Sequence, residues 1–502
     1  MDTLHSITRR RLALSGALAV GFAFGLSELV AAVLRQPSPV RAIGDFVIDN
    51  VPPGVKDWAI DTFGIYDKLV LVIGIVAVGL LIGAAVGLTM RRGPGLATGA
   101  FVVFAVVGAV AANQDPLASP LGPWLVAMVG AGAGIAALRW LGREASIPDP
   151  GRRAFIARAG VVAGLGVLLA AGGRALATQL GRLIAGRDDV VLPDAGEVVA
   201  APGADADFMV PNLTPIVVPN EDFYRIDTAL VVPQLDLDEW QLSITGMVER
   251  PFTLTYQELV DLPLVERYVT LSCVSNPVGG NLVGNARWLG VPLTDLLDRA
   301  RVQPEAEQLV GIAVDEFTVG FPVQAAYDGR EAMVAVGMNG EPLPFEHGFP
   351  ARLVVSGLYG YVSATKWLRE INLTSWDGFD AYWVPRGWSK EGPIKTQSRI
   401  DTPRSSLAAG SHPIAGVAWA PNVGIDRVEI QVDEGPWLDA ALSAPLSLDT
   451  WVQWKLDYPF TAGTHSIRVR ATDSTGAVQP ETPTPVAPDG ATGWHRVTVS
   501  VG

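Results

Sequence analysis

Residues 268–280 read Tyr268-Val-Thr-Leu-Ser-Cys-Val-Ser-Asn-Pro-Val-Gly-Gly280, an apolar, strand-like run that breaks into a polar, glycine-rich loop. Cys273 is the only cysteine among 502 residues, so it cannot form an intramolecular disulfide. Core packing, nucleophilic attack and metal ligation are the roles open to it. Position alone favours packing, because free cysteine is among the most buried residue types. The rest of the chain decides between these roles.

Long apolar stretches alternate with short charged segments in the first 190 residues. Five of them approach the roughly 20 residues that a helix needs to cross the hydrocarbon core of a membrane. The predicted spans are Leu12–Leu34, Leu69–Met90, Leu96–Ala112, Leu121–Leu138 and Phe155–Ala171. The sequence therefore predicts an N-terminal helical transmembrane domain, and the membrane itself is an expected partner.

Arginines indicate the orientation of these spans, since Lys and Arg in short loops favour the cytoplasmic side. With five spans, one set of arginines lies on the same side of the membrane: Arg9, Arg10, Arg11, Arg91, Arg92, Arg139, Arg143, Arg152 and Arg153. Arg174, Arg182 and Arg187 after the fifth span oppose this assignment. The balance predicts a multi-pass protein of the plasma membrane with a cytoplasmic N-terminus and everything after the fifth span outside.

Two arginine pairs, in Thr8-Arg-Arg-Arg-Leu-Ala13 and Gly151-Arg-Arg-Ala-Phe-Ile-Ala157, resemble the twin-arginine export signal. Ordinary positive-inside charge explains them equally well. The formal net charge is −14, and the acidic excess lies after residue 190. An acidic outer part argues against nucleic acid and anionic lipid as partners.

The outer part is predicted to contain two further domains after an extended linker rich in Pro, Ala, Gly and Asp. Trp240–Val248 alternates as a half-buried strand, Thr255-Tyr-Gln-Glu258 is a capping box that opens a helix over Gln257–Asp261, and Leu293–Ala300 favours another helix. This mixture indicates an α+β domain.

After Arg404 short strand runs such as Asp426–Gly435 and His465–Gly476 alternate with turns, which is typical of an immunoglobulin-like all-β sandwich. The predicted limits are 1–187 for the transmembrane domain, 188–219 for the linker, 220–403 for the α+β domain and 404–502 for the sandwich.

Five motifs occur in an order that identifies a family. They are Pro219-Asn-Glu-Asp-Phe-Tyr-Arg225, Thr270-Leu-Ser-Cys-Val-Ser-Asn276, Met338-Asn-Gly-Glu-Pro-Leu-Pro344 with His347-Gly-Phe-Pro-Ala-Arg352, Lys366-Trp-Leu368 and Trp494-His-Arg-Val497. With them, residues 210–502 resemble the sulfite oxidase family of molybdopterin enzymes. The resemblance implies a Mo-molybdopterin cofactor and oxygen-atom or two-electron transfer on a small-molecule substrate.

The resemblance also assigns residues. Cys273 matches the family's molybdenum ligand, and a soft thiolate suits a metal that changes oxidation state. Cys273 and Arg225 are the expected catalytic residues. The expected cofactor-binding residues are Asn220, Phe223, Tyr224, Arg225, Cys273, Asp315, His347, Arg352, Ala364, Thr365 and Lys366. Arg, Lys and His suit the phosphate and the hydrogen-bonding rings of a pterin.

The sequence departs from the sulfite oxidases where those enzymes bind sulfite. Pro277, Val278, Gly279 and Gly280 stand where the family carries arginines, and Phe317 stands at a tyrosine position. The substrate therefore stays open between a small anion that is oxidised and an S-oxide or N-oxide that is reduced. A non-catalytic binding module of the cell envelope and a transporter or sensor are alternatives from other classes.

No haem and no iron-sulfur cluster is expected in the chain, because His5 is the only histidine before His347 and Cys273 stands alone. Electrons must then pass to or from a separate partner protein. The family's sandwich domain commonly forms dimers, and Trp419, Trp437, Trp451 and Trp454 supply aromatic surface for a homodimer interface or for the core.

Overall fold

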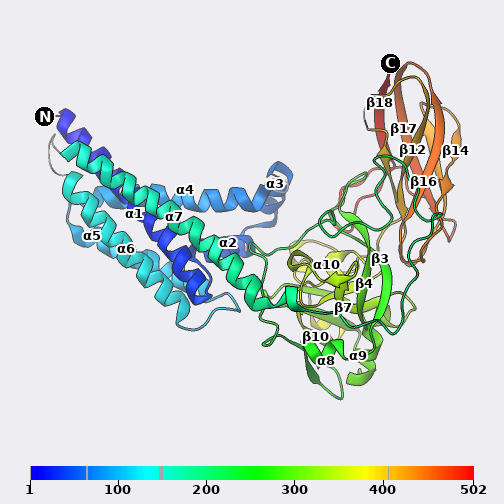
Figure 1. Cartoon of the computed structure of the whole chain (residues 1–502), viewed down its shortest axis with the longest axis horizontal. Helices are drawn as coiled ribbons and strands as arrows, with labels where there is room; N and C mark the ends of the chain where they lie inside the picture. The colour runs from blue at the N-terminus through cyan, green and yellow to red at the C-terminus, as the bar shows by residue number, and fades with distance from the viewer. Residues whose placement is uncertain (1, 64–65, 146–150, 405) are drawn as a thin grey trace. The chain divides into compact units, whose positions relative to one another are not determined.

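The computed structural model describes residues 2–63, 66–145, 151–404 and 406–502. Two compact units make up the chain (Figure 1). Unit 1 contains Met1–Ala185 and the short segment Thr228–Pro233, and unit 2 contains Gly186–Asp227 and Gln234–Gly502. The side chains of Arg143 and Arg152 lie outside the described part.

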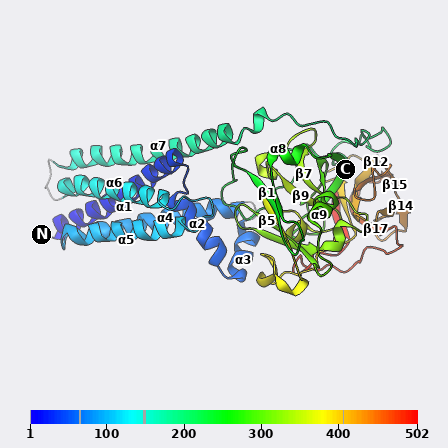
Figure 2. The ribbon, with the colours of Figure 1, turned by 90° about the horizontal axis from the view of Figure 1, so that it is seen from below.

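Unit 1 is helical. Its helices are α1 (Asp2–Leu34), α2 (Pro39–Asn50), α3 (Pro53–Phe63), α4 (Asp67–Thr89), α5 (Pro94–Ala112), α6 (Gly122–Ala145) and α7 (Gly151–Ala185). Helix α1 packs against α4, α6 and α7, as Figures 1 and 2 show. At the α1–α4 contact a Cβ on Gly16 would lie 2.0 Å from the carbonyl oxygen of Gly83. Glycine therefore lets these two backbones touch, as is common between helices in membranes.

Five helices of the described chain are long and apolar enough to cross a membrane: Arg9–Leu34, Asp67–Thr89, Pro94–Ala112, Gly122–Gly142 and Arg153–Asp189. They coincide with the five predicted apolar segments. The last continues beyond the predicted end at Ala171, because the Ala-, Leu- and Arg-rich residues that follow are good helix formers. Large apolar side chains such as Leu81 (70% exposed) cover their outer surface.

Unit 2 begins with two sheets and short helices. The elements are β1 (Gln241–Gly246), β2 (Phe252–Thr255), α8 (Tyr256–Val260), β3 (Val265–Ser272), β4 (Val283–Pro292), α9 (Leu293–Ala300), β5 (Gln308–Ala313), β6 (Thr318–Pro322), β7 (Ala332–Met338), β8 (Glu341–Pro342), β9 (Arg352–Val355), α10 (Gly360–Ser363) and β10 (Leu368–Thr374). One sheet has the order β2-β1-β10-β5-β6 and the other β3-β4-β7-β8, with β9 paired to β7. The predicted strand at 240–248 and helix at 293–300 are confirmed.

The capping box predicted at Thr255 is present at the start of α8. The Thr255 hydroxyl accepts a hydrogen bond from the backbone N–H of Glu258 at 3.3 Å, and the Glu258 carboxylate accepts the backbone N–H of Thr255 at 2.8 Å. Thr255→Ala should destabilise the protein by about 1 kcal/mol, the usual value of such a cap. Denaturant unfolding measures the loss, and Thr253→Ala on the exposed face of β2 should cost less.

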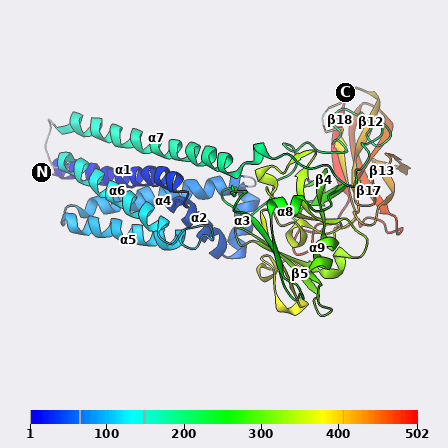
Figure 3. The same ribbon diagram turned by 60° about the horizontal axis from the view of Figure 1, so that its bottom comes forward.

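Two four-stranded sheets form the C-terminal part (Figure 3). Their strands are β11 (Gln397–Thr402), β12 (Gly410–Trp419), β13 (Ile425–Val432), β14 (Trp437–Asp439), β15 (Ala441–Leu442), β16 (Val452–Phe460), β17 (Gly463–Asp473) and β18 (His495–Val501), in the orders β11-β12-β16-β15 and β14-β13-β17-β18. Their apolar residues form one core cluster that includes Trp454. Trp419 and Trp451 are also fully buried, whereas Trp437 is half-buried and packs edge-on against Trp494 at 5.0 Å.

An extended segment before β1 connects the two parts of unit 2. The carbonyl oxygen of Ile216 accepts the side-chain amide of Asn285 on β4 and the indole N–H of Trp451, each at 2.8 Å. Val218 donates its backbone N–H to the Asn285 carbonyl at 2.9 Å. This segment thereby fixes Asn220 and the residues after it beside β4.

Candidate active site around Cys273

Cys273 is the first residue after β3, and hydrogen bonds close the loop that follows it. Its backbone N–H donates to the Leu282 carbonyl at 2.9 Å, and Asn276 accepts the Leu282 N–H on its side-chain oxygen at 2.9 Å. The side chain is 7% exposed. Burial raises the pKa of the Cys273 thiol, against the lowering effect of Ser275 and of the Lys366 charge. Burial therefore favours the neutral thiol, and a nearby cation such as a metal ion would be required to stabilise a thiolate here.

The segment at Asn220 meets the loop at His347. The Asn220 carbonyl lies 3.0 Å from His347 Nε2, and the Asn220 side-chain oxygen accepts the Asn339 amide at 2.8 Å. Phe223 stacks on Tyr224 at 5.2 Å and lies edge-on to His347 at 5.5 Å. Burial raises the pKa of Tyr224, and the negative charge of Cys273 raises it further.

Arg352 at the start of β9 is a buried cation. Its guanidinium donates to the His347 carbonyl at 3.1 Å and to the Leu353 carbonyl at 3.4 Å, and it lies 5.0 Å from the ring of Trp288. Burial lowers the pKa of Arg352 to about 10. A buried guanidinium whose hydrogen bonds go to carbonyls and an aromatic face favours a bound anion such as a phosphate.

Lys366 and Arg225 share one carboxylate. Lys366 Nζ lies 3.2 Å from Asp227 Oδ2 and donates to the Glu346 carbonyl at 2.9 Å, while Arg225 Nε lies 2.9 Å from the same Asp227 oxygen. Burial lowers the pKa of Lys366 to about 8, although Asp227 opposes the shift. Glu346 is a second negative charge near Arg225, and Arg352 is a third positive charge near Lys366. Three cations for two carboxylates leave this group with an excess of positive charge.

The remaining predicted residues lie next to this group. Ala364 follows α10, and Thr365 places a buried hydroxyl without a hydrogen-bond partner directly before Lys366. Asp315 lies in the turn between β5 and β6 and accepts the Phe317 N–H at 3.2 Å. The backbone N–H of Val314 donates to the Trp367 carbonyl at 3.0 Å, and this contact joins the Asp315 turn to the Lys366 segment.

Among the described residues, twelve buried side-chain atoms have no hydrogen-bond partner, and three of them belong to this site: His347 Nδ1, Thr365 Oγ1 and Asn276 Nδ2. Since buried polar groups are nearly always paired, these atoms and the Arg352 guanidinium fit a polar, anionic cofactor. No group of three or more His, Cys, Asp or Glu side chains that could hold a metal occurs within the described residues.

Two residues of this group were not assigned from the sequence. Asp227 is the carboxylate shared by Arg225 and Lys366, and Trp288 is the aromatic face beneath Arg352. Asp227 follows Arg225 by two positions in one motif-bearing segment, and that spacing was the available signal. Phe317 packs against Tyr382 with ring centroids 5.4 Å apart.

His347 should make the stability of the cofactor-free protein dependent on pH. Burial, followed by the Lys366 and Arg352 charges, lowers its pKa from 6.5 to about 3. The unfolded chain then binds a proton that the folded one does not, so stability falls as the pH drops below 6.5 and levels off below about 3. From about pH 7.5 to about pH 5 this residue should cost about 2 kcal/mol.

Thermal unfolding of the wild type and of His347→Gln at the two pH values measures this difference. Gln keeps a donor for the Asn220 carbonyl but cannot take up the proton. His412→Gln, on β12, is the matched control and should retain the wild-type dependence on pH. Equal acid sensitivity of the wild type and His347→Gln would contradict the prediction.

The second part of the chain is similar to known molybdopterin proteins. Residues 229–383 match the model of the oxidoreductase molybdopterin binding domain, and residues 394–502 match the Mo-co oxidoreductase dimerisation domain. Human mitochondrial sulfite oxidase is 29% identical over 339 residues, which cover 57% of this chain and 62% of that protein. The uncharacterized oxidoreductase YuiH of Bacillus subtilis is 32% identical over 157 residues, covering 31% of this chain and 76% of that protein.

The chain belongs to the sulfite oxidase family of molybdopterin oxidoreductases. Family membership implies a Mo-molybdopterin cofactor, and the match to the dimerisation domain supports a homodimer. Among solved structures, the sulfane dehydrogenase SoxCD of Paracoccus pantotrophus is similar with 26% identity and a TM-score of 0.48, covering 53% of this chain and 75% of that one. The chain spans 62% of the length of the human sulfite oxidase that it matches.

Proposed function

We propose that this protein is a membrane-anchored, extracytoplasmic oxidoreductase in which Cys273 ligates the molybdenum of Mo-molybdopterin. The observation that carries the proposal is the excess of buried positive charge next to the chain's single cysteine, together with three unpartnered buried polar atoms. Bound Mo-molybdopterin supplies two-electron and oxygen-atom transfer, and the protein supplies orientation and electrostatics.

Each residue of the site has a role in this proposal. Arg352 and Lys366 would bind the anionic end of the cofactor, while His347 Nδ1 and Thr365 Oγ1 would offer hydrogen bonds to its polar groups. Asn220, Phe223, Tyr224 and Ala364 would line the cofactor, Asp315 would contact it from the β5–β6 turn, and Arg225 would be the second catalytic residue. Burial would keep water from the Cys273 thiolate, and the Tyr224 hydroxyl, whose pKa burial raises, stays neutral and can hold a proton.

The charges near the Cys273 loop favour an uncharged S-oxide or N-oxide substrate over sulfite. Arg399 contacts the loop but pairs with Asp401 at 2.7 Å, and Arg404 shares that carboxylate at 3.4 Å. Arg225, the proposed second catalytic residue, likewise pairs with Asp227 at 2.9 Å. An oxyanion gains little from cations that already face carboxylates, and Pro277 and Val278 add no charge.

The remaining architecture fits an anchored enzyme. We propose domains at 1–187, 188–219, 220–403 and 404–502, with five membrane spans, a cytoplasmic N-terminus, an outer catalytic domain and an immunoglobulin-like C-terminal sandwich. Twin-arginine export would carry the outer domain across already folded with its cofactor. Electrons pass to or from a separate partner protein. The alternative is a non-catalytic binding module, which would exchange no electrons with a partner.

Metal and pterin analysis of the purified full-length chain, followed by a substrate screen, tests the proposal. We expect about one molybdenum per chain and turnover of S- or N-oxides with a reduced dye in preference to sulfite oxidation. Protein that is folded but lacks molybdenum when produced in a host that makes the cofactor would refute the oxidoreductase and favour the binding module. Rapid sulfite oxidation would refute the substrate assignment alone.

A further inference from the structure

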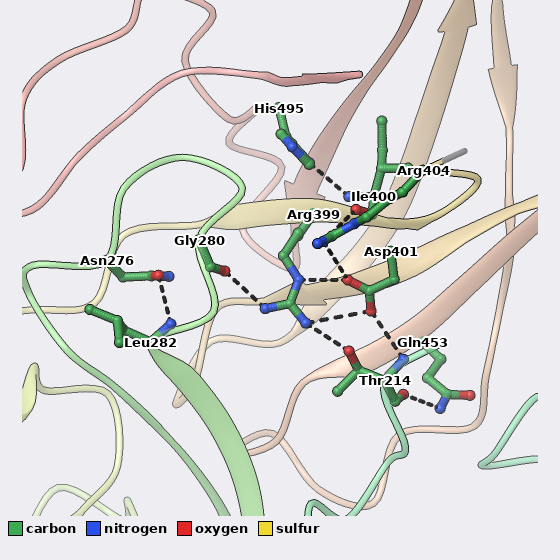
Figure 4. A network of polar contacts seen from close by, with 10 residues as sticks. All are labelled: Thr214, Asn276, Gly280, Leu282, Arg399, Ile400, Asp401, Arg404, Gln453 and His495. Carbon is green, nitrogen blue, oxygen red and sulfur yellow. Dashed lines mark hydrogen bonds and ion pairs between the residues drawn. The ribbon is translucent and has the colours of Figure 1, made fainter. Parts of the chain in front are cut away.

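A buried ion pair on β11 lies against the loop that begins at Cys273 (Figure 4). Arg399 and Asp401 point to the same side of the strand, with Arg399 Nε 2.7 Å from Asp401 Oδ1 and Arg399 Nη2 3.4 Å from Oδ2. They are 4% and 5% exposed. A pair so buried must satisfy its remaining donors to avoid a large desolvation cost.

The other N–H groups of Arg399 reach two separate segments. Nη1 donates to the Gly280 carbonyl at 2.9 Å, and Nη2 donates to the Thr214 hydroxyl at 2.8 Å. Thr214 in turn donates its backbone N–H to Asp401 Oδ2 at 3.1 Å. Figure 4 shows the guanidinium between the Gly280 loop on one side and Asp401 with Thr214 on the other. One planar side chain thus joins the C-terminal sheet, the extended segment and the cysteine loop.

Gly280 lies near the point where the loop returns to Cys273. Its backbone N–H donates to the Pro277 carbonyl at 2.8 Å, and two residues later Leu282 closes the loop through Cys273 and Asn276. Gly279 has φ of 75°, and a Cβ there would lie 2.2 Å from His495 Cδ2. His495 is itself held by the Ile400 N–H, which donates to its Nδ1 at 2.9 Å. The loop is therefore packed against β11 and β18 as well as hydrogen-bonded to Arg399.

We infer that Arg399 is a positioning residue, which restrains the Cys273 loop through the Gly280 carbonyl so that the C-terminal domain helps to set the position of the cysteine sulfur. The restraint itself follows from the contacts of the chain. Its consequence for a metal ligand rests on the proposed function. Arg399 touches neither the substrate nor the cofactor in this assignment.

The single cysteine makes the restraint measurable, since any thiol reagent reports on Cys273 alone. Arg399→Lys keeps the charge opposite Asp401 but loses the fork that also reaches Gly280. In the full-length, cofactor-free chain we expect iodoacetamide to alkylate Cys273 about tenfold faster in this variant. Local opening of the loop then breaks one charged hydrogen bond fewer than in the wild type. In the molybdenum-loaded protein we expect a changed Mo(V) electron paramagnetic resonance signal.

Arg404→Lys is the matched control. Arg404 also pairs with Asp401, at 3.4 Å, but its side chain is 57% exposed and its other hydrogen bond goes to the Ile400 carbonyl. Its alkylation rate and its Mo(V) signal should stay at the wild-type values. Thr214→Val, which removes an acceptor of Arg399 without burying an unpaired charge, should increase the alkylation rate in the same direction if Arg399→Lys fails to fold.

The inference would be overturned if folded Arg399→Lys were alkylated at the wild-type rate. If Arg399→Lys does not fold, a wild-type rate in Thr214→Val would overturn it. An equal acceleration in Arg404→Lys would also overturn it, because the effect would then come from Asp401 and not from the loop contact. Absence of molybdenum from the wild type would overturn the proposed function instead, and the comparison of alkylation rates would still decide whether Arg399 restrains the loop.

Discussion

Replacing Cys273 with serine or alanine should lower turnover at least about 100-fold, because even a residue that only orients a metal ligand commonly contributes 10–100-fold. The Cys273 side chain is 7% exposed, and burial disfavours its charged form, which a bound metal would stabilise. Steady-state rates with the substrate found in the screen, normalised to molybdenum content, measure the loss.

The pair of substitutions separates ligation from packing. A cysteine that only fills the core behaves as a small hydrophobe, so alanine would be tolerated and would keep nearly full turnover. A metal ligand tolerates neither replacement. Thermal unfolding of both variants should stay close to the wild type, which shows that the fold is intact. Full turnover in folded Cys273→Ala would contradict the assignment of Cys273 as the ligand.

Local sequence signals predicted several helices of the fold. The capping box at Thr255, the amphipathic helix Leu293–Ala300 and the five apolar helices all depend on residues close together in the chain, and each is present. The ordered motifs also named residues that contact one another in the fold, such as Asn220 and His347. Short-range patterns and motif order were sufficient for these features because neither requires knowledge of which strands pair.

Long-range partners could not be predicted in the same way. Asp227 becomes the counterion of Lys366 across 139 positions, and Arg399 reaches Gly280 across 119. Trp288 lies beneath Arg352 only because β4 and β9 both pair with β7. These contacts depend on strand register and on burial, which the sequence of one chain does not specify at this precision.

Replacing Arg352 with methionine should lower the molybdenum and pterin content at least about tenfold under equal purification, since losing one partner of a buried charge pair costs several kcal/mol. The guanidinium has carbonyl and aromatic partners within the protein, so its charge is available to an anionic cofactor. Metal analysis and pterin fluorescence of the purified full-length protein measure the loss.

The same substitution should not lower the stability of the cofactor-free chain. A buried cation without a paired anion is destabilising, and an apolar side chain of similar length removes that cost. Cofactor-free Arg352→Met should therefore unfold at the same temperature as the wild type or higher. Arg369→Met on β10 is the control, because Arg369 forms a surface pair with Glu316 at 2.7 Å and should alter neither quantity. Full cofactor content combined with lower stability in Arg352→Met would make Arg352 a structural residue, and the anion site would then have to rest on Lys366.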